Sequence, residues 1–430
     1  MSAHFGTLAE ALAYQQGAHG LSIDLGLERV REVAARLGLL DKRCPAVIVG
    51  GTNGKGSTAC CLAAMLAACG HRAGLFTSPH LVRYNERVQI DGMPVGDAAL
   101  LRAFERIEAV RGSVTLTFFE YNTLAALEVF RNAGVTVMVL EVGLGGRLDA
   151  TNIIDADVAV LCSVGLDHRD WLGDTLAQIG GEKAGIFRPG QAVVFGSADM
   201  PDSVWQRAAE LDCRLFVAGR DFSVRVHGDG GGAQPWDFRS ASCNLDGLPA
   251  PSLAGTIQYR NAACALAALN LLAVTGACEP QRIALALCSI RLPGRFQIVP
   301  GEVEWILDVA HNEPAAIVLA SELQARRIDG RTIAVAGMLS DKDVAAVARA
   351  LDAVVDHWLL AGISDEPRGL SATALQARLP PLRGTVELAG RVEVACQSAR
   401  ARARARAHDR VIVLGSFHVV GPALVWLGLY

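Results

Sequence analysis

The chain has 430 residues, of which 51% are hydrophobic and 20% are charged, and its formal net charge is −4. This length favours two domains over a single hydrophobic core, and the apolar content excludes an intrinsically disordered chain. The negative charge gives no general attraction to nucleic acid or to an anionic membrane, so we expect neither as a partner.

Neither a targeting signal nor a membrane span is predicted. The segment 1–16 has no basic region, and Glu10 lies where a signal peptide would need an apolar run. The longest uncharged helical stretch, 262–278, is short for a bilayer span and includes Asn270. We therefore interpret it as a buried core helix.

Cysteine usage favours a reducing compartment. The 11 cysteines are odd in number and include no CxxC pair. Five of them lie in Ala- and Leu-rich helical runs, where a free thiol behaves as a small buried apolar group: Cys60, Cys61, Cys69, Cys264 and Cys288. We expect a cytoplasmic protein that acts as a monomer.

Short β-branched runs alternate with amphipathic helical stretches in the N-terminal part, which is typical of a parallel α/β fold. The predicted strands are 46–49, 135–142, 158–163 and 191–195, and the predicted helices are 27–37, 57–68, 98–110, 121–131 and 175–184. Short segments punctuated by glycine, including GDGGG at 228–232, then predict a small antiparallel meander over about 220–250. Two further helices are expected at 261–272 and 280–289.

The segment RLPGR at 291–295 interrupts regular structure and marks a domain boundary. The βα alternation then resumes, with strands at 303–309, 331–336, 355–360 and 410–414 and helices at 314–327, 342–351 and 391–407. We therefore predict a mostly parallel, doubly wound N-terminal P-loop domain (1–290), a linker (291–297) and a smaller Rossmann-like α/β domain (298–430). The ARARARARA run at 399–407 places its arginines on two sides of a helix, which indicates a solvated helix surface.

The segment VIVGGTNGKGST at 47–58 is an apolar strand that enters a glycine-rich turn and then a helix. In such a loop the backbone N–H groups converge on phosphate oxygens, and Lys55 adds a full positive charge. The spacing departs from the common GxxxxGK[ST] form, because Gly56 follows the lysine and the hydroxyl comes one place later, at Ser57. The strand–loop–helix context favours a nucleotide site over an unliganded tight turn.

Two more polar side chains follow strands of the predicted sheet. Glu141 ends the run MVLEV, and His168 follows the strand at 158–163. The carboxyl ends of parallel strands share one edge of a sheet, and the P-loop opens from that edge too. A carboxylate and an imidazole there predict a phosphate-bound Mg²⁺ site, although each residue alone is equally well explained as a satisfied buried polar group.

Ten segments distributed along the chain together resemble the bifunctional dihydrofolate synthase/folylpolyglutamate synthases, a branch of the Mur ligase superfamily. They are IDLGLERV (23–30), GTNGKGST (51–58), TSPHLVRYNERV (77–88), TFFEYNTLAAL (117–127), LEVGLGGRLDATN (140–152), GLDHRDWLG (165–173), EKAGIF (182–187), LPGRFQIV (292–299), LDVAHN (307–312) and LGSFHVV (414–420). The resemblance implies an ATP-dependent ligase that activates a carboxylate as an acyl phosphate and joins it to L-glutamate, with dihydropteroate and reduced folates as acceptors.

The resemblance also implies roles for individual residues, and Lys55, Lys183 and His311 would be the catalytic ones. The triphosphate of ATP would be held by Thr52, Asn53, Gly54, Lys55, Gly56 and Ser57, with further nucleotide contacts from Asn261, Arg295 and Asp308. The Mg²⁺ ligands would be Ser78, Glu141 and His168, and Lys183 matches a lysine that the family carbamylates. The pterin substrate pocket would include Asp24, Thr117, Phe118, Phe119, Glu120, Leu148, Asp149 and Ala150, and the incoming glutamate would lie near His311 and Ser416.

Plain structural explanations stay open for several of these residues. Lys183 can equally be a surface cation on a helix, and Asp24 can be a helix N-cap before Leu25. Phe118 and Phe119 can be core residues. One position departs from the family pattern, because AHNEP at 310–314 has Glu313 where the family has proline, which adds a negative charge beside the expected glutamate site.

Two other functions compete with this interpretation. One is a Mur-type ligase that acts on a different carboxylate acceptor, such as a cell-wall precursor. The other is a P-loop GTPase-like switch, but the NKxD guanine motif is missing and SDKD at 340–343 is a poor match in the wrong domain.

Overall fold

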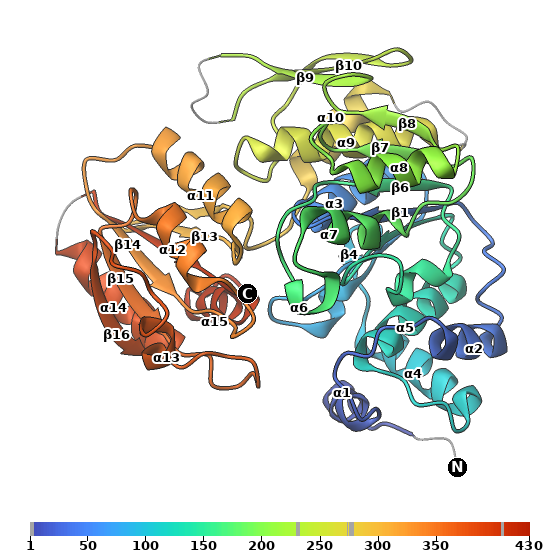
Figure 1. The fold of residues 1–430 in the computed structure, drawn as a ribbon, viewed down its shortest axis with the longest axis horizontal. Coiled ribbons are helices and arrows are strands. Elements are labelled where there is room, and N and C mark those ends of the chain that lie inside the picture. Colours follow the sequence, from blue (N-terminus) through green and yellow to red (C-terminus); the bar gives the residue numbers. More distant parts are fainter. Residues whose placement is uncertain (1–3, 229–232, 273, 275–278, 406–407) are drawn as a thin grey trace.

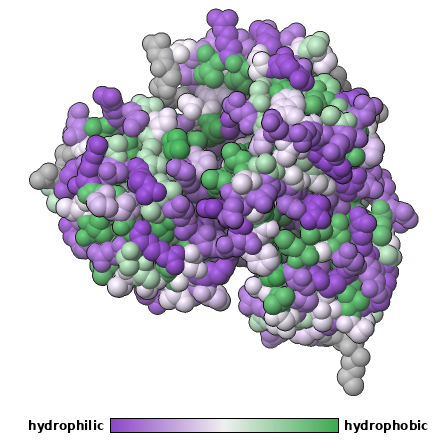
Figure 2. All heavy atoms as spheres, in the orientation of Figure 1, coloured by the Kyte–Doolittle hydropathy of each residue, from purple (hydrophilic) through white to green (hydrophobic). Residues whose placement is uncertain are grey.

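The computed structural model describes residues 4–228, 233–272, 274, 279–405 and 408–430, which form two α/β lobes (Figure 1). On the face shown in Figure 2, hydrophobic residues occur in small areas scattered among hydrophilic ones, and a notch separates the two lobes on the lower side. None of the described helices is both long and apolar enough to cross a bilayer.

The N-terminal lobe is built on an eight-stranded sheet with the order β4-β3-β2-β5-β1-β6-β7-β8. Its strands are β1 Ala46–Gly50, β2 Ala73–Phe76, β3 Val88–Ile90, β4 Met93–Pro94, β5 Val137–Glu141, β6 Val158–Leu161, β7 Ala192–Phe195 and β8 Arg214–Val217. The neighbouring strands in the order β2-β5-β1-β6-β7-β8 pair in parallel. Only β3 and β4, at one edge of the sheet, pair in an antiparallel manner, β3 with β2 and β4 with β3. The nucleotide loop follows β1, near the middle of this sheet.

Helices cover both faces of the sheet, because successive side chains of each buried strand point to opposite sides. On one face Ile48 and Leu140 pack with α2 Glu28–Leu37, α4 Asp97–Arg111, α5 Phe118–Ala133 and α8 Asp202–Glu210. On the other face Val47 and Val139 pack with α3 Lys55–Ala68, α9 Ile257–Leu271 and α10 Pro280–Ser289. The helices α1 Leu8–Gly17, α6 Arg169–Leu172 and α7 Leu176–Ala184 complete the lobe.

The predicted meander is a three-stranded antiparallel sheet of β9 Phe222–Val226, β10 Trp236–Ser240 and β11 Asn244–Leu248. Its apolar side chains join the same core as α3 and α9. Most of the GDGGG run, at 229–232, lies outside the described residues.

The C-terminal lobe has a six-stranded sheet with the order β12-β13-β17-β14-β15-β16. The strands are β12 Gln297–Val299, β13 Glu304–Leu307, β14 Thr332–Ala336, β15 His357–Ala361, β16 Thr385–Gly390 and β17 Arg410–Leu414, and only β12 is antiparallel. The helices α11 Glu313–Ala325, α12 Val344–Leu351 and α13 Ala372–Gln376 pack on one face, and α14 Val392–Arg404 and α15 Phe417–Trp426 pack on the other.

The predicted fold class is confirmed, and each predicted strand and helix has a counterpart at its place in the chain. The predictions about cysteine hold only in part. Cys60, Cys61 and Cys264 are buried, but Cys288 is exposed and Cys69 is disulfide-bonded, against the expectation of small buried thiols. The last residues of the predicted helices at 262–278 and 391–407 fall partly outside the described residues.

Candidate functional site

The glycine-rich loop after β1 folds as expected for a phosphate-binding turn. Gly51 and Gly54 have φ angles of 142° and 90°, which favour glycine, and Gly54 directly precedes α3. A side chain at Gly54 would place its Cβ 2.8 Å from Oδ1 of Asn261, one of the predicted nucleotide contacts. The backbone N–H of Asn53 donates to the Ser163 hydroxyl, which fixes the turn against the loop after β6. The structure thus places Asn261 beside the predicted triphosphate loop.

The two lysines predicted to be catalytic both contact this loop, Lys55 from the start of α3 and Lys183 from α7. Lys55 Nζ donates to the carbonyl oxygens of Gly51 and Thr52, at 3.0 and 3.1 Å, and Lys183 Nζ donates to the Gly51 carbonyl at 3.1 Å. Lys183 is only 4% exposed, so it is not the surface cation that sequence alone allowed. Burial, reinforced by the charge of Lys55, lowers the pKa of Lys183 to about 7. A neutral amine is therefore accessible near neutral pH.

Glu141 lies at the end of β5 and faces the start of α3. Its Oε2 accepts the backbone N–H of Ser78 at 3.1 Å, and both carboxylate oxygens would lie 3.5 Å from a Cβ at Gly56. Burial raises the pKa of Glu141, and the charge of Lys55 opposes this shift. A second cation beside this carboxylate would favour its ionised form.

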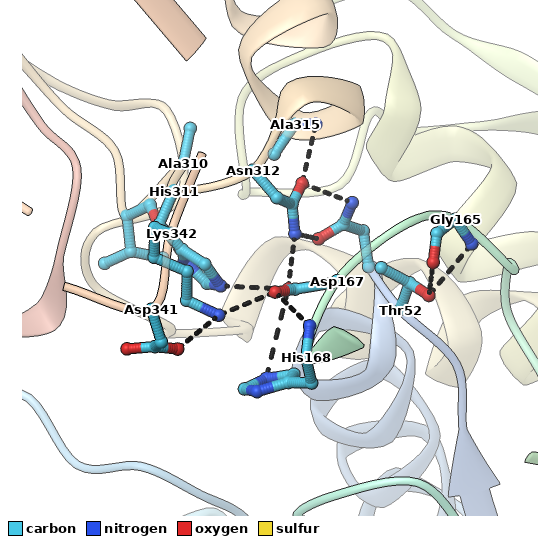
Figure 3. A network of polar contacts seen from close by, with 12 residues as sticks. Thr52, Gly165, Asp167, His168, Ala310, His311, Asn312, Ala315, Asp341 and Lys342 are labelled. Carbon is cyan, nitrogen blue, oxygen red and sulfur yellow. Dashed lines mark hydrogen bonds and ion pairs between the residues drawn. The ribbon is translucent and has the colours of Figure 1, made fainter. Parts of the chain in front are cut away.

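Asp167, in the loop after β6, joins the two lobes (Figure 3). Its Oδ1 accepts from Lys342 Nζ at 2.6 Å, and its Oδ2 accepts from Asn312 Nδ2 at 2.9 Å. His311 Nε2 lies 3.5 Å from the same Oδ2. Burial alone would raise the pKa of Asp167. The hydrogen bond from His311 and the charge of Lys342 outweigh it and hold this pKa well below its usual range.

The side chain of Asn312, which bonds to Asp167, also bonds to Asn53 in the nucleotide loop. The amides of Asn53 and Asn312 exchange two hydrogen bonds, of 3.0 and 3.1 Å, and the Asn312 Oδ1 also accepts the backbone N–H of Ala315 as the N-cap of α11. The start of α11 therefore lies directly against the loop that carries Lys55.

His168 is the residue after Asp167 and has a left-handed backbone with φ 52°. Burial lowers its pKa to about 3, against the attraction of Asp167, so the imidazole is neutral at physiological pH and able to ligate a metal. A cavity joins His168 to the lysines, and it is lined by Gly51, Thr52, Lys55, Val142, Gly143, Leu144, Gly145, Asp167, His168 and Lys183.

The donor chemistry of the predicted metal ligands fits Mg²⁺ in part. Glu141 and Ser78 offer oxygen atoms, whereas the imidazole of His168 is an unusual ligand for this hard cation. No group of three or more His, Cys, Asp or Glu side chains arranged for a metal occurs among the described residues. Such a site would thus need phosphate oxygens and water to complete it, as Mg²⁺ sites at nucleotides usually do.

Arg295 and Asp308 contribute from the linker and the C-terminal lobe. The guanidinium of Arg295 stacks over the Phe417 ring at 5.0 Å, and its NH2 would lie 3.8 Å from a Cβ at Gly56, at the start of α3. Asp308 accepts the backbone N–H groups of Phe296 and Ala310, both at 2.7 Å, and so organises the turn around Arg295. Burial raises the pKa of Asp308 and lowers that of Arg295.

The two residues predicted near the incoming glutamate follow different C-terminal strands, His311 after β13 and Ser416 after β17. The ring of His311 is oriented by a 2.8 Å contact of Nδ1 with the Val309 carbonyl, which leaves Nε2 directed at Asp167. Ser416 is buried and caps α15 by accepting the N–H of His418. Glu313 is the first residue of α11 and is exposed.

Asp24 lies in a charged cluster rather than at a helix start. Arg29 NH1 donates to Asp24 at 2.6 Å, and His19 Nε2 lies 3.1 Å from the same oxygen. The helix α2 begins at Glu28, with Leu27 as its N-cap, so the N-cap interpretation of Asp24 is wrong. Arg29 also reaches Glu120 at 3.3 Å.

The other residues of the predicted pterin pocket have clear structural contacts. Thr117 and Glu120 form a capping box at the start of α5, and the Phe119 ring lies 5.8 Å from the Phe76 ring. Phe118 and Phe119 are half-buried against the core, so the core interpretation holds in part for both. Leu148 is half-buried and Ala150 is buried.

Asp149 organises the loop that follows β5. It is 3% exposed and accepts the N–H groups of Gly143, Leu144 and Thr151 and the hydroxyl of Thr151, at 2.6–3.0 Å. These bonds occupy both carboxylate oxygens, so Asp149 fixes the conformation of this loop.

Sequence reasoning missed three residues of the interlobe network, Asp167, Asn312 and Lys342. Asp167 and Asn312 lie inside GLDH and AHN, segments that carry the resemblance, but the resemblance implies no role for either residue. Lys342 belongs to SDKD, which is a poor match to a guanine motif and gives no sign of a contact with the other lobe. The sequence feature that could have identified Lys342 is its position in the loop after the predicted strand 331–336, because functional groups gather at the carboxyl ends of parallel strands.

Comparisons with known proteins agree with this geometry. Residues 49–269 match the family model of the Mur ligase middle domain, and residues 294–417 match that of the Mur ligase glutamate ligase domain. The dihydrofolate synthase/folylpolyglutamate synthase of Escherichia coli K12 is 44% identical over 420 residues, which cover 97% of this chain and 94% of that protein.

Solved structures are similar over the whole length. One is the E. coli enzyme in complex with DHPP and ADP, with a TM-score of 0.92, 42% identity and coverage of 100% of this chain and 99% of that one. Another is a bifunctional folylpolyglutamate synthase/dihydrofolate synthase with Mn, AMPPNP and L-glutamate bound, with a TM-score of 0.88, 42% identity and full coverage of both chains. The chain belongs to the dihydrofolate synthase/folylpolyglutamate synthase family of the Mur ligases and is an ATP-dependent ligase.

Proposed function

We propose that this enzyme adds L-glutamate to dihydropteroate, giving dihydrofolate, and to reduced folates, giving folylpolyglutamates, through an acyl phosphate. The observation that carries the proposal is the Asn53–Asn312–Asp167 network, which joins the nucleotide loop to the strand ends expected to receive glutamate. Full-length similarity to enzymes of this name supports the choice of substrates.

The nucleotide would lie along the loop of Thr52, Asn53, Gly54, Lys55, Gly56 and Ser57, with Asn261, Arg295 and Asp308 around it. Converging N–H groups at the start of α3 and the charge of Lys55 suit a triphosphate. Ser78, Glu141 and His168 would hold Mg²⁺, which when bound offsets charge on the phosphate oxygens. The Mn and AMPPNP in a structure of a relative support a divalent cation with ATP here.

Lys183 is proposed to be carbamylated. Its buried amine, with a pKa of about 7, is neutral often enough to attack CO₂, which forms an N–C bond and releases one proton. The product is an anionic group beside Lys55, whose charge would stabilise it. The modification therefore replaces a repulsive pair of cations by an attractive pair.

The reaction would proceed in two displacements. The acceptor carboxylate attacks the γ-phosphorus of ATP, ADP leaves, and Lys55 and Arg295 offset charge on the transferred oxygens. The amine of glutamate, held near His311 and Ser416, then attacks the acyl carbon. The tetrahedral intermediate loses one amine proton and expels phosphate, which leaves the amide. Because the site is assembled from both lobes, their contact excludes water that would hydrolyse the acyl phosphate.

The acceptor would bind on the α2–α5 side of the N-terminal lobe. Asp24, with its partner Arg29, offers charged hydrogen-bonding groups, and Phe118 and Phe119 offer half-buried rings for a flat heterocycle. Thr117, Glu120, Leu148, Asp149 and Ala150 would shape this pocket, Asp149 through the loop that it folds.

A parallel assay of acceptors tests the proposed substrates. With ATP, Mg²⁺ and L-glutamate, both dihydropteroate and tetrahydrofolate should give glutamate-dependent phosphate release, whereas UDP-muramyl substrates should give none. Phosphate release with a UDP-muramyl acceptor alone would instead favour a ligase for another carboxylate. Equal activity with GTP and no acceptor would contradict any ligase assignment.

Removing the charge of Asp167 should impair assembly of the site. Asp167→Asn leaves Lys342 without its buried partner, and loss of one member of such a pair costs about 2–5 kcal/mol, so we expect kcat/KM to fall by roughly 30-fold or more. The double variant Asp167→Asn/Lys342→Met should lose no more kcat/KM than Asp167→Asn alone, because both changes remove the same contact. Asp174→Asn, at an exposed carboxylate of the same segment, is the matched control, and full additivity of the pair would contradict the coupling.

We propose a cytoplasmic monomer without nucleic acid or membrane partners, with domains at 1–290 and 298–430 joined by the linker 291–297. The short strand β12, Gln297–Val299, pairs with the C-terminal sheet, which supports a boundary close to this place but puts Gln297 itself in the C-terminal domain. Gel filtration with light scattering would test the monomer.

A further inference from the structure

The loop between β2 and β3 of the N-terminal lobe, residues 77–87, reaches into the C-terminal lobe. Leu81, near its tip, packs against the apolar cluster formed by the C-terminal sheet, α14 and α15. Its side chain also approaches the linker, where a Cβ at Gly294 would lie 3.4 Å from Leu81 Cδ1. The contact lies on the opposite side of the C-terminal sheet from α11, and so is separate from the Asp167 network.

Gly421 of α15 receives the backbone of this loop. A Cβ at Gly421 would lie 2.2 Å from the carbonyl oxygen of Leu81 and 3.2 Å from its carbonyl carbon. Real Cβ atoms do not approach backbone this closely, and a backbone carbonyl cannot rotate away as a side chain can. Any larger residue at 421 therefore forces helix and loop apart.

The loop is stiff enough to transmit such a displacement. The Glu86 carboxylate accepts the N–H groups of Leu81, Val82 and Arg83 at 2.7–2.9 Å, which ties the tip to the 3₁₀ turn Tyr84–Arg87. Glu86 also accepts the hydroxyl of Tyr430 at 2.5 Å, a second contact between this loop and the C-terminal lobe.

At its other end the same loop carries Ser78. The N–H of Ser78 donates to Glu141, and the N–H of Thr77 donates to the Arg87 carbonyl at 2.9 Å. Only three peptide units separate Ser78 from Leu81, so a shift of the tip by an ångström moves Ser78 relative to Glu141.

We propose that Gly421 is a positioning residue, at which α15 docks on the Leu81 backbone and thereby sets the loop 77–87 against the nucleotide site when the lobes close. This inference deepens the proposed function and rests on it, because closure matters only to an enzyme that assembles its site from both lobes. Gly421 touches no substrate and acts through the loop.

A competing structural reason exists for glycine at this place. Gly421 precedes Pro422 within a helix, and the proline ring crowds the Cβ of the residue before it. The two explanations separate in a Pro422→Ala background. There the crowding by proline is gone, whereas the Leu81 carbonyl remains.

The experiment uses the full chain and five variants. They are Gly421→Ala, Pro422→Ala, their double variant, Leu81→Ser and the control Val425→Ala at an exposed site of the same helix as Gly421. Small-angle scattering would measure the radius of gyration with and without AMPPNP and Mg²⁺, and thermal melting would measure the shift that this nucleotide causes. Initial rates of glutamate-dependent phosphate release would give kcat and KM.

We expect Gly421→Ala to lose the nucleotide-induced decrease in the radius of gyration and most of the nucleotide-induced rise in melting temperature. Both losses should occur with Pro422 and with Pro422→Ala. Without nucleotide, Gly421→Ala should melt close to the temperature of the wild type. Its kcat should fall by roughly 100-fold, since misplacement of reacting groups by about 1 Å has that effect. Leu81→Ser, which removes the apolar tip without adding bulk, should change the same quantities in the same direction.

Compaction and turnover at wild-type levels in Gly421→Ala would overturn the inference, and so would a defect that disappears in the Pro422→Ala background. A wild-type protein that turns over but does not compact would also overturn it, because there would be no closure to position. A wild-type protein that lacks ligase activity with every acceptor would instead count against the proposed function.

Discussion

Lys55→Ala should abolish ATP-dependent turnover with every acceptor. Lys55 provides the full positive charge in the loop after β1, where it is held by the carbonyls of Gly51 and Thr52. Removal of one preorganised donor at a transferring group costs a factor of 10²–10³ in many enzymes, and a full charge offsets more than a neutral donor. We therefore expect a loss of about 10³-fold or more in kcat, equivalent to roughly 4 kcal/mol. Release of ADP under saturating substrates is the measurement.

The control for this variant is Lys42→Ala. Lys42 is an exposed lysine on the same lobe that pairs with Asp157, so its loss removes a surface ion pair and no phosphate contact. It should leave kcat within about twofold, as expected of a surface pair. Retained turnover in Lys55→Ala would contradict the assignment of the nucleotide loop.

Lys183→Met should inactivate the enzyme and at the same time stabilise its fold in CO₂-depleted buffer. Its folded-state pKa of about 7 lies below the ordinary value of 10.5, so the unfolded chain binds more protons between these two values. The free energy of unfolding of the wild type then rises with pH across this window, and below it the cost of the buried amine is fully present. At pH 8 that cost is on the order of 3 kcal/mol, and methionine removes it.

Lys183→Met also tests whether Lys183 acts as a carbamate or as an unmodified amine with a structural role. Bicarbonate should raise both the activity and the melting temperature of the wild type after CO₂ depletion, because the carbamate replaces the buried cation by an anion beside Lys55. Neither quantity should respond to bicarbonate in Lys183→Met. Wild-type activity independent of CO₂ at every pH would rule the modification out.

Most of the fold was predictable because the buried strands are short apolar runs separated by periodic helices. The elements that escaped prediction carry weak or mixed signals. Strand β2 contains Gly74, helix α15 contains Pro422, and both place backbone where another part of the chain approaches closely. Helix α1 did carry a signal, the capping box of Thr7 and Glu10, but its apolar periodicity is slight.

The candidate site was predictable where a residue follows a strand in a distinctive motif, as Lys55 and Glu141 do. Burial decided between the alternatives for Lys183, and sequence does not report burial of an isolated lysine on a helix. Asp167 and Lys342 escaped because their meaning depends on contact between two lobes, and no local pattern encodes a partner 175 residues away. Local motifs thus identified chemistry, while the pairing across lobes needed three-dimensional contacts.

The division of the Asp167 network between the lobes has a consequence for recombination. Asp167 and Asn53 come from the N-terminal lobe, whereas Asn312 and Lys342 come from the C-terminal lobe, so neither half inherits a complete set. A chimera that joins lobes of two relatives within the proposed linker 291–297 is expected to fold each half on its own core, because the two lobes have separate hydrophobic cores. It should be active only when both parent enzymes have the same residues at these four positions. The interlobe pairs, and not overall sequence identity, therefore decide which parents can be combined.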